Sequence, residues 1–185
     1  MTSRADLDEI AKWLAEQVQP AKDDIFGPGY RAAAYLTDGT FLPCVNFRNP
    51  ERTVDLAIRR FDQTRNDASL HDSVNYRSIV KSFTTSGSRL SPWDIARVEK
   101  SRFAVPAPLR DSVYSAGETR MSWISFVGKM DDGTEHWFGS AFHVEFFEMP
   151  IDYSGEQLIE VFPHRQNEGK CYRDLPFFEC FLDGL

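Results

Sequence analysis

The feature that most constrains this chain is an Asp-Gly pair that occurs twice, each time between two apolar runs. The first pair, Asp38-Gly39, separates residues 32–36 from residues 41–47. A two-residue type I′ turn requires positive φ at both central positions, which Asp and Gly tolerate, so this pattern predicts a β-hairpin. Pro43 has no N–H to donate, and we therefore expect an open strand edge beside it.

The second pair, Asp132-Gly133, lies between residues 121–130 and residues 135–147. A two-residue turn at this point would place Ser122 opposite His143 on the neighbouring strand. Both faces of this second hairpin carry large apolar side chains. We expect it to be buried on both faces, or buried on one and used for binding on the other.

Four further segments have the patterns of helices. The expected helices are residues 4–18 with Ser3 as the N-cap, a segment that begins at Asn49-Pro50 and carries a stripe of Val54, Ala57, Ile58 and Phe61, residues 74–83, and a segment that begins at Ser91-Pro92-Trp93-Asp94 and ends before residues 103–108. Residues 154–162 fit either a short helix or a strand, and residues 172–185 fit a C-terminal strand or an extended segment.

These patterns together predict an α+β fold, in which about four helices pack on an antiparallel sheet built from two or more hairpins. The length of 185 residues is typical of one domain, so residues 1–185 are expected to form a single unit. The helix at 4–18 could serve as a packing arm of that unit.

The composition favours a cytoplasmic protein. No apolar run approaches the ~20 residues of a membrane span, and acidic residues interrupt the apolar positions near Met1, where a signal peptide would be continuous. Three widely spaced cysteines without a Cys-x-x-Cys motif indicate reduced thiols rather than disulfides or a zinc site. The sequence therefore gives no reason to expect a cofactor, a metal or a membrane partner.

The charge is unevenly distributed along the chain. The net charge of −7 disfavours nucleic acid as a partner. Residues 48–110 contain twelve basic and seven acidic residues, whereas residues 145–185 contain nine acidic and three basic ones. These two segments face each other inside the fold, are merely solvated, or meet a partner of opposite charge.

The first functional hypothesis is a non-enzymatic domain that binds another protein, such as a small inhibitor, an immunity-type protein or a regulatory partner. Aromatic residues make up 14% of the chain, which leaves material for a binding surface as well as a core. The expected contact residues lie in the acidic, aromatic tail: Glu160, Phe177, Phe178, Glu179, Phe181 and Asp183.

The alternative hypothesis is a small hydrolase. The predicted register of the second hairpin brings Ser122 opposite His143, and Glu145 is on the same face, so the three side chains supply a nucleophile, a base and an acid. No Gly-x-Ser-x-Gly motif accompanies them. A polar rim with an Arg120–Glu145 pair explains the same residues without catalysis.

A second version of the hydrolase uses a thiol. Cys171 follows His164 in a polar stretch, and Lys170 and Arg173 would lower its pKa if the thiol were exposed. A partly buried structural cysteine is the simpler interpretation. The four histidines lack the spacing of a metal site, so no metal ligands are predicted.

Overall fold

The computed structural model describes residues 6–66, 88–141 and 143–185, and its fold is α+β with two sheets. The α-helices are α1 (Leu7–Gln17), α2 (Glu51–Asn66) and α4 (Ala107–Ala116). The strands are β1 (Tyr30–Leu36), β2 (Phe41–Arg48), β3 (Arg89–Leu90), β4 (Ile95–Lys100), β5 (Ile124–Met130), β6 (Glu135–Ser140), β7 (Leu158–Pro163), β8 (Cys171–Arg173) and β9 (Phe178–Phe181). Short 3-10 helices occupy Pro92–Asp94 and Gly155–Gln157.

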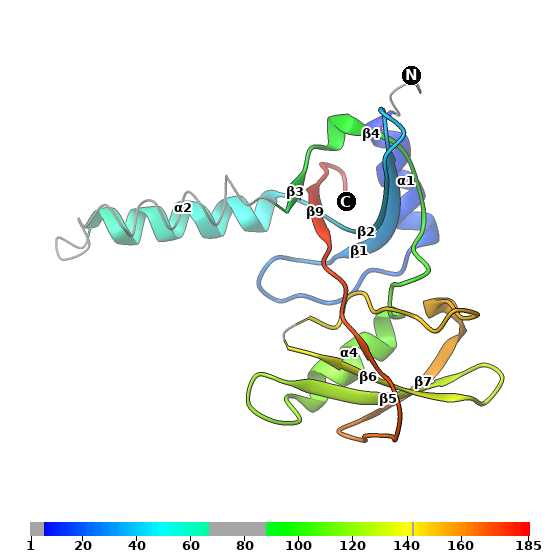
Figure 1. The fold of residues 1–185 in the computed structure, drawn as a ribbon. Coiled ribbons are helices and arrows are strands. Elements are labelled where there is room, and N and C mark those ends of the chain that lie inside the picture. Colours follow the sequence, from blue (N-terminus) through cyan, green and yellow to red (C-terminus); the bar gives the residue numbers. More distant parts are fainter. Residues whose placement is uncertain (1–5, 67–87, 142) are drawn as a thin grey trace.

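The first sheet has the strand order β3-β9-β2-β1-β4 and carries α1 (Figure 1). α1 contributes Ile10, Ala11 and Leu14 to a core that includes Phe47 of β2 and Ile95 of β4. β9 runs parallel to both β2 and β3, so the C-terminal end of the chain completes a sheet that the N-terminal part began.

The second sheet has the order β7-β5-β6-β8, and the hairpin β5–β6 forms its centre. α4 contributes Val113 to a second core, in which Phe126, Phe138 and Phe147 contact one another through stacked and edge-to-face rings. Val127, the neighbour of Phe126 on β5, is also fully buried. Because adjacent side chains on a strand point to opposite faces, β5 is covered on both sides, which is the first of the two alternatives considered.

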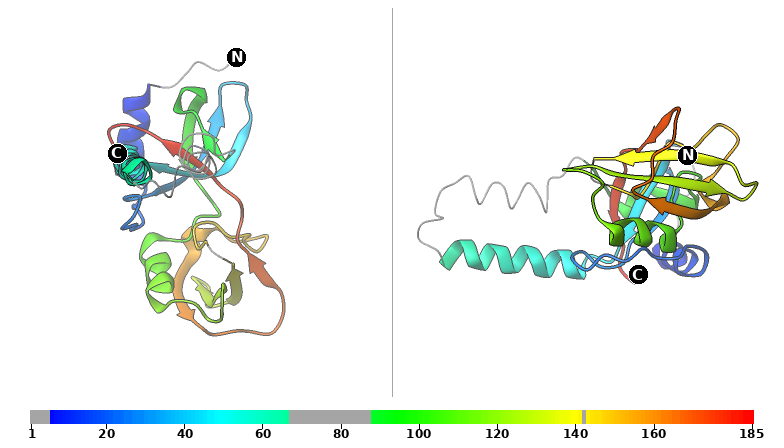
Figure 2. Two further views of the ribbon diagram at one scale, coloured as in Figure 1. Left: turned by 90° about the vertical axis from the view of Figure 1, so that its left-hand side faces the viewer. Right: turned by 90° about the horizontal axis from the view of Figure 1, so that it is seen from below.

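The chain crosses between the two sheets more than once. It leaves the first sheet after β4, builds the second, and returns from β8 to β9 (Figures 1 and 2). α2 projects away from both sheets, and the left view of Figure 2 looks along it. Among the described residues, no helix has the length and apolarity needed to cross a membrane.

Both predicted hairpins are present, but the type of turn was predicted wrongly. In each loop the Gly alone has positive φ, at 92° for Gly39 and 88° for Gly133, so the loops have three residues rather than two. In the second loop the Gly133 N–H donates to Met130 O and the Met130 N–H donates to Thr134 O. The extra loop residue shifts the pairing by one position relative to the prediction.

Two of the predicted helices are corrected here, and a third is not tested. α1 begins at Leu7 with Asp6 as its N-cap, because the Asp6 side chain accepts from the Asp8 N–H. The apolar stripe of α2 is not packed on the sheet, since Val54 and Ile58 are about half exposed. The helix predicted at residues 74–83 lies outside the described residues.

The helix predicted from Ser91 is wrong beyond its first turn. Ser91 caps a 3-10 turn by accepting from the Trp93 N–H, but the chain then becomes strand β4, which pairs with β1 and buries Ile95. Residues 103–108 were expected to follow the end of that helix. Their two prolines instead begin α4, with Pro106 at the N-cap and Pro108 in the first turn. The described residues therefore hold three α-helices and two sheets, where about four helices on one hairpin-built sheet were expected.

Two smaller predictions are refined. Residues 154–162 form both of the alternatives considered, a 3-10 turn followed by β7, and the C-terminal segment forms two strands, one in each sheet. Pro43 lies at a bulge between β1 and β2, and β9 pairs with β2 only from Val45 onward.

Candidate functional site

The Ser-His-acid arrangement is not assembled. Ser122 lies before the first residue of β5 in a turn with φ of 54°, and the shifted register no longer places it opposite His143. The exposed His143 ring contacts Phe177. Glu145 is buried, and its carboxylate is bound by Arg110 rather than directed at a histidine.

The thiol arrangement is not assembled either. Cys171 lies on β8 and His164 directly follows β7, and these two strands are opposite edges of the second sheet. Three strand spacings separate them, which is roughly 14 Å. His164 Nε2 instead bonds to the Ala116 carbonyl at 2.9 Å. Burial raises the pKa of the Cys171 thiol, although Arg173 acts in the opposite direction, and a raised pKa reduces the thiolate population.

The predicted binding residues are distributed over both sheets. Glu160 is on the edge strand β7 and pairs with Lys129 at 3.7 Å. Glu179 lies within the first sheet and is bound by Arg48 at 3.2 Å and by Asn46 at 3.2 Å, so it does not serve as a surface charge. Burial raises its pKa, and Arg48 partly opposes that shift. Phe177, Phe178, Phe181 and Asp183 follow one another along the segment that contains β9.

Part of this tail contributes to a groove at the N-terminal end of α1. The groove has a volume of about 500 Å³ and is lined by Asp6, Leu7, Asp8, Pro92, Trp93, Phe181, Leu182 and Asp183. Its walls therefore come from three segments that are distant in the sequence: the start of α1, the 3-10 turn before β4, and the residues at the end of β9. We refer to it as the acidic groove.

The acidic groove combines exposed carboxylates with an exposed indole. Asp6, Asp8 and Asp183 are all exposed, and the described residues that line it include no lysine or arginine. The Trp93 side chain is 58% exposed, which is unusual for the largest apolar side chain. Aromatic anchors beside charged groups are typical of surfaces that bind other proteins.

A different arrangement lies between the two sheets, where two arginine side chains and one glutamate side chain are buried together. Arg110 of α4 binds Glu145 through Nη2 at 2.6 Å and through Nε at 3.2 Å, and its Nη1 donates to the Lys22 carbonyl at 2.6 Å. Arg31 of β1 approaches the same carboxylate only to 3.8 Å. Two buried guanidinium groups thus share one buried carboxylate.

Arg31 is the poorly compensated member of this cluster. Only 4% of the residue is exposed, and its buried Nε and Nη1 atoms have no hydrogen-bond partner among the residues that the structure describes. Burial is the main cause that lowers the pKa of Arg31 to about 10; Glu145 opposes the shift and Arg110 adds to it. Burying a cation with unmet donors costs stability, so Arg31 is an unfavourable element of this cluster.

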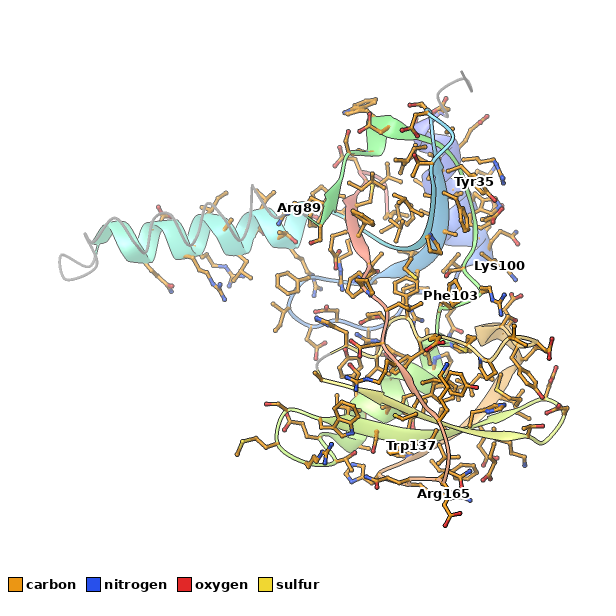
Figure 3. All side chains as sticks on the ribbon, in the orientation of Figure 1. Tyr35, Arg89, Lys100, Phe103, Trp137 and Arg165 are labelled. Carbon is orange, nitrogen blue, oxygen red and sulfur yellow. The ribbon has the colours of Figure 1, made fainter. Side chains whose placement is uncertain are left out.

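Arg31 lines a pocket of about 290 Å³ at the C-terminal end of α1, which we call the Arg31 pocket. The pocket is lined by Gln17, Val18, Gln19, Arg31, Lys100, Ser101, Ala104, Val105, Pro106, Ala107 and Glu156. Lys100, which also lines the pocket, is labelled in Figure 3 close to the junction of the two sheets. Lys100 is paired with Glu156 at 2.6 Å, so the rim is close to neutral while the interior holds a cation.

Within the described part of the chain, no group of three or more His, Cys, Asp or Glu side chains is arranged to hold a metal ion. Comparisons with protein-family models, with curated proteins and with solved structures found no match to this chain. The functional argument therefore rests on the two sites at the ends of α1.

The sequence analysis missed most of the residues of these sites. It assigned Trp93 to the start of a helix, and it used Asp6 and Asp8 only as helix-terminal or charged residues. One sequence signal pointed to Arg31: it is a charged residue within the otherwise apolar segment that forms β1. Nothing in the local sequence links Arg31 with Arg110 and Glu145, because these residues meet only when the two sheets assemble.

Proposed function

We propose that this protein is a non-enzymatic domain that binds another protein, and that the acidic groove is the contact surface. The single observation that carries the proposal is the convergence of Asp8, Trp93 and Asp183, from three distant segments, on one open groove. The aromatic and acidic character predicted for the tail is retained in Phe181 and Asp183.

The charge and apolar area of the groove indicate what kind of segment the partner presents. Because every charged group among the described lining residues is a carboxylate, the matching segment carries lysine or arginine. Trp93 and Phe181 offer apolar area for at least one apolar side chain of that segment. We therefore expect the partner to present a basic segment with an apolar anchor, and to associate faster at low salt than at high salt.

A pair of charge reversals tests the proposal. Asp183→Lys changes the acidic groove, whereas Glu160→Lys changes another exposed carboxylate, on the edge of the other sheet. Each tagged protein is used to capture partners from a lysate of the source organism at low and moderate salt. We expect one stoichiometric partner to bind the unmodified protein and Glu160→Lys, to be lost from Asp183→Lys, and to be released as salt rises.

Several outcomes would overturn this proposal. Equal capture by Asp183→Lys and the unmodified protein would remove the acidic groove from consideration, and equal loss in both variants would indicate bulk charge rather than a site. A captured protein that is a second copy of the chain would replace the proposal with self-association. Glu179→Lys is unsuitable as a test, because Glu179 is bound to Arg48 inside the sheet.

A further inference from the structure

We propose that His136 is a pH-sensitive switch of the second sheet. In its neutral form the His136 ring packs between Tyr153 and Tyr172, and in its protonated form it leaves these rings to pair with Asp132, which loosens residues 150–157. The switch is separate from the acidic groove, because the described residues that line that groove include none of these side chains.

The first argument is the surroundings of the His136 ring. His136 lies on β6, two residues before Phe138, so its side chain points to the face that carries the second core. Its ring centroid lies 5.2 Å from that of Tyr153 and 5.7 Å from that of Tyr172, both in edge-on contacts. Its Nε2 atom is buried and forms no hydrogen bond with any described residue.

This position suits the neutral ring and not the charged one. A neutral imidazole leaves one ring nitrogen without a hydrogen, whereas an imidazolium carries an N–H on both. Protonation of His136 in place would therefore bury a charged donor that has no acceptor. The protonated ring is stable only if it moves to an anion.

Two of the neighbouring elements offer no such anion. The Tyr172 ring of β8 contacts a cation as well as His136, because Lys170 Nζ lies 4.6 Å from its centroid. Lys170 is itself paired with Glu148 at 2.6 Å. On β5 the partner of His136 is Gly128, which has no side chain. These groups favour the neutral ring.

The anion that can receive the protonated ring is Asp132, and it is already engaged. Its Oδ2 accepts from Tyr153 Oη at 2.7 Å, and the same hydroxyl lies 3.3 Å from Thr134 Oγ1. Asp152 is a further acid close to Tyr153. Burial lowers the pKa of His136, and Asp132 opposes that shift. A protonated His136 thus competes with Tyr153 for one carboxylate.

The outcome of this competition reaches the segment before β7. Tyr153 links residues 150–157 to the turn between β5 and β6, beside a backbone hydrogen bond from the Asp131 N–H to Gln157 O at 2.8 Å. Arg102 separately binds the carbonyls of Ile151 and Tyr153. Loss of the Tyr153 link should therefore loosen the segment locally and leave the rest of the fold intact.

The first test follows the melting temperature of the full chain from about pH 8 to about pH 5, the range in which histidine titrates. His136→Phe keeps a ring between the two tyrosines but cannot be protonated. His143→Phe is the matched control, because it makes the same change at an exposed histidine whose ring contacts Phe177.

The expected sign follows from the direction of the pKa shift. Because the pKa of His136 is lower in the folded than in the unfolded chain, its contribution to stability is complete above about pH 6.5 and is lost as the pH falls through the folded-state pKa. We expect the melting temperature of the unmodified protein, relative to His136→Phe, to fall on acidification. The same comparison with His143→Phe should show a smaller fall.

A second measurement separates a switch from a histidine that is merely buried. Amide hydrogen exchange is measured at Tyr153, Gly155 and Gln157, whose N–H groups are all hydrogen-bonded. We expect their protection factors to fall severalfold as His136 is protonated, while those of β1 in the first sheet stay unchanged. Asp132→Asn removes the receiving charge, so it should lower the pKa of His136 further, as measured by NMR titration.

The proposal is overturned if the measured pKa of His136 is not below about 6.5, the ordinary value for histidine. It is also overturned if the unmodified protein and His136→Phe respond equally to pH, or if protonation of His136 leaves residues 150–157 fully protected. If His136→Phe does not fold, His136→Gln serves in the same comparison, and the NMR titration and the exchange measurement on the unmodified protein decide without a variant.

Discussion

The two ends of α1 use charge in opposite ways. At the N-terminal end, the carboxylates of Asp6, Asp8 and Asp183 are exposed around the acidic groove. At the C-terminal end, Arg31 is buried beside the Arg31 pocket, and its Nε and Nη1 atoms form no hydrogen bond with any described residue. One helix, seated on one sheet, thus separates a solvated anionic surface from a desolvated cationic pocket.

This difference shows what each charge can contribute. Exposed carboxylates are screened by water and salt, so they add little to stability but can guide a basic partner. A buried guanidinium group is poorly screened, so it reduces stability until an acceptor reaches it. The acidic groove is therefore suited to fast, salt-sensitive association with a protein, whereas the buried Arg31 lowers the stability of the fold.

The largest expected effect concerns the buried end and its second arginine. Arg110→Met leaves Glu145 without its main partner, so we expect the free energy of unfolding to fall by about 3–5 kcal/mol. Arg31→Met, the matched change on the same carboxylate, is expected to cost little. Urea denaturation of both variants measures the contrast, and equal losses would show that Arg31 and Arg110 share Glu145 evenly.

The next effect concerns the helix that joins the two sites. Leu14 of α1 is fully buried in the first core, and Leu14→Ala should lower the free energy of unfolding by about 2–5 kcal/mol. Lys12→Ala, on the exposed side of the same helix, should change it by less than about 0.5 kcal/mol. If Leu14→Ala had no larger effect than Lys12→Ala in chemical denaturation, α1 would not be seated on the sheet as described.

The smallest effect separates two roles of one residue in the acidic groove. Asp6 caps α1 and lines the groove, so Asp6→Ala should lower the free energy of unfolding by about 1 kcal/mol. Asp6→Asn keeps a capping oxygen and removes the charge. We expect its stability to be unchanged and its association with the captured partner to be slower, which denaturation and surface plasmon resonance would measure. An unchanged association rate would limit Asp6 to a structural role.

The sequence predicted the α+β class and both hairpins, because Asp-Gly turns between apolar runs are local signals. It did not determine the loop length, since a Gly with positive φ fits the last position of a three-residue loop as well as a two-residue turn. That single residue moved Ser122 away from His143. Ser91-Pro92 likewise marks a helical turn correctly, but only the pairing of β4 with β1 decides that a strand follows it.

The sites were less predictable than the fold, because each is built from distant segments. The ion pair between Arg110 and Glu145 joins residues 35 positions apart, on α4 and on the segment after β6. Phe181 and Asp183, which the sequence analysis named as candidates for binding, line the acidic groove, and their role in binding is a proposal. Trp93 lines the groove only because the start of α1 and the end of β9 lie beside it in the fold, so its local sequence did not indicate a role in binding.

The most direct test of the account is site-specific photocrosslinking from the acidic groove in living cells. A photoreactive phenylalanine replaces Trp93, and in a control protein it replaces Ile151, which is 87% exposed and lies outside the groove. The account predicts a crosslink to one basic partner from position 93, lost when Asp183→Lys is added, and no crosslink to that partner from position 151. Crosslinks to the same protein from both positions, or from neither, would contradict it.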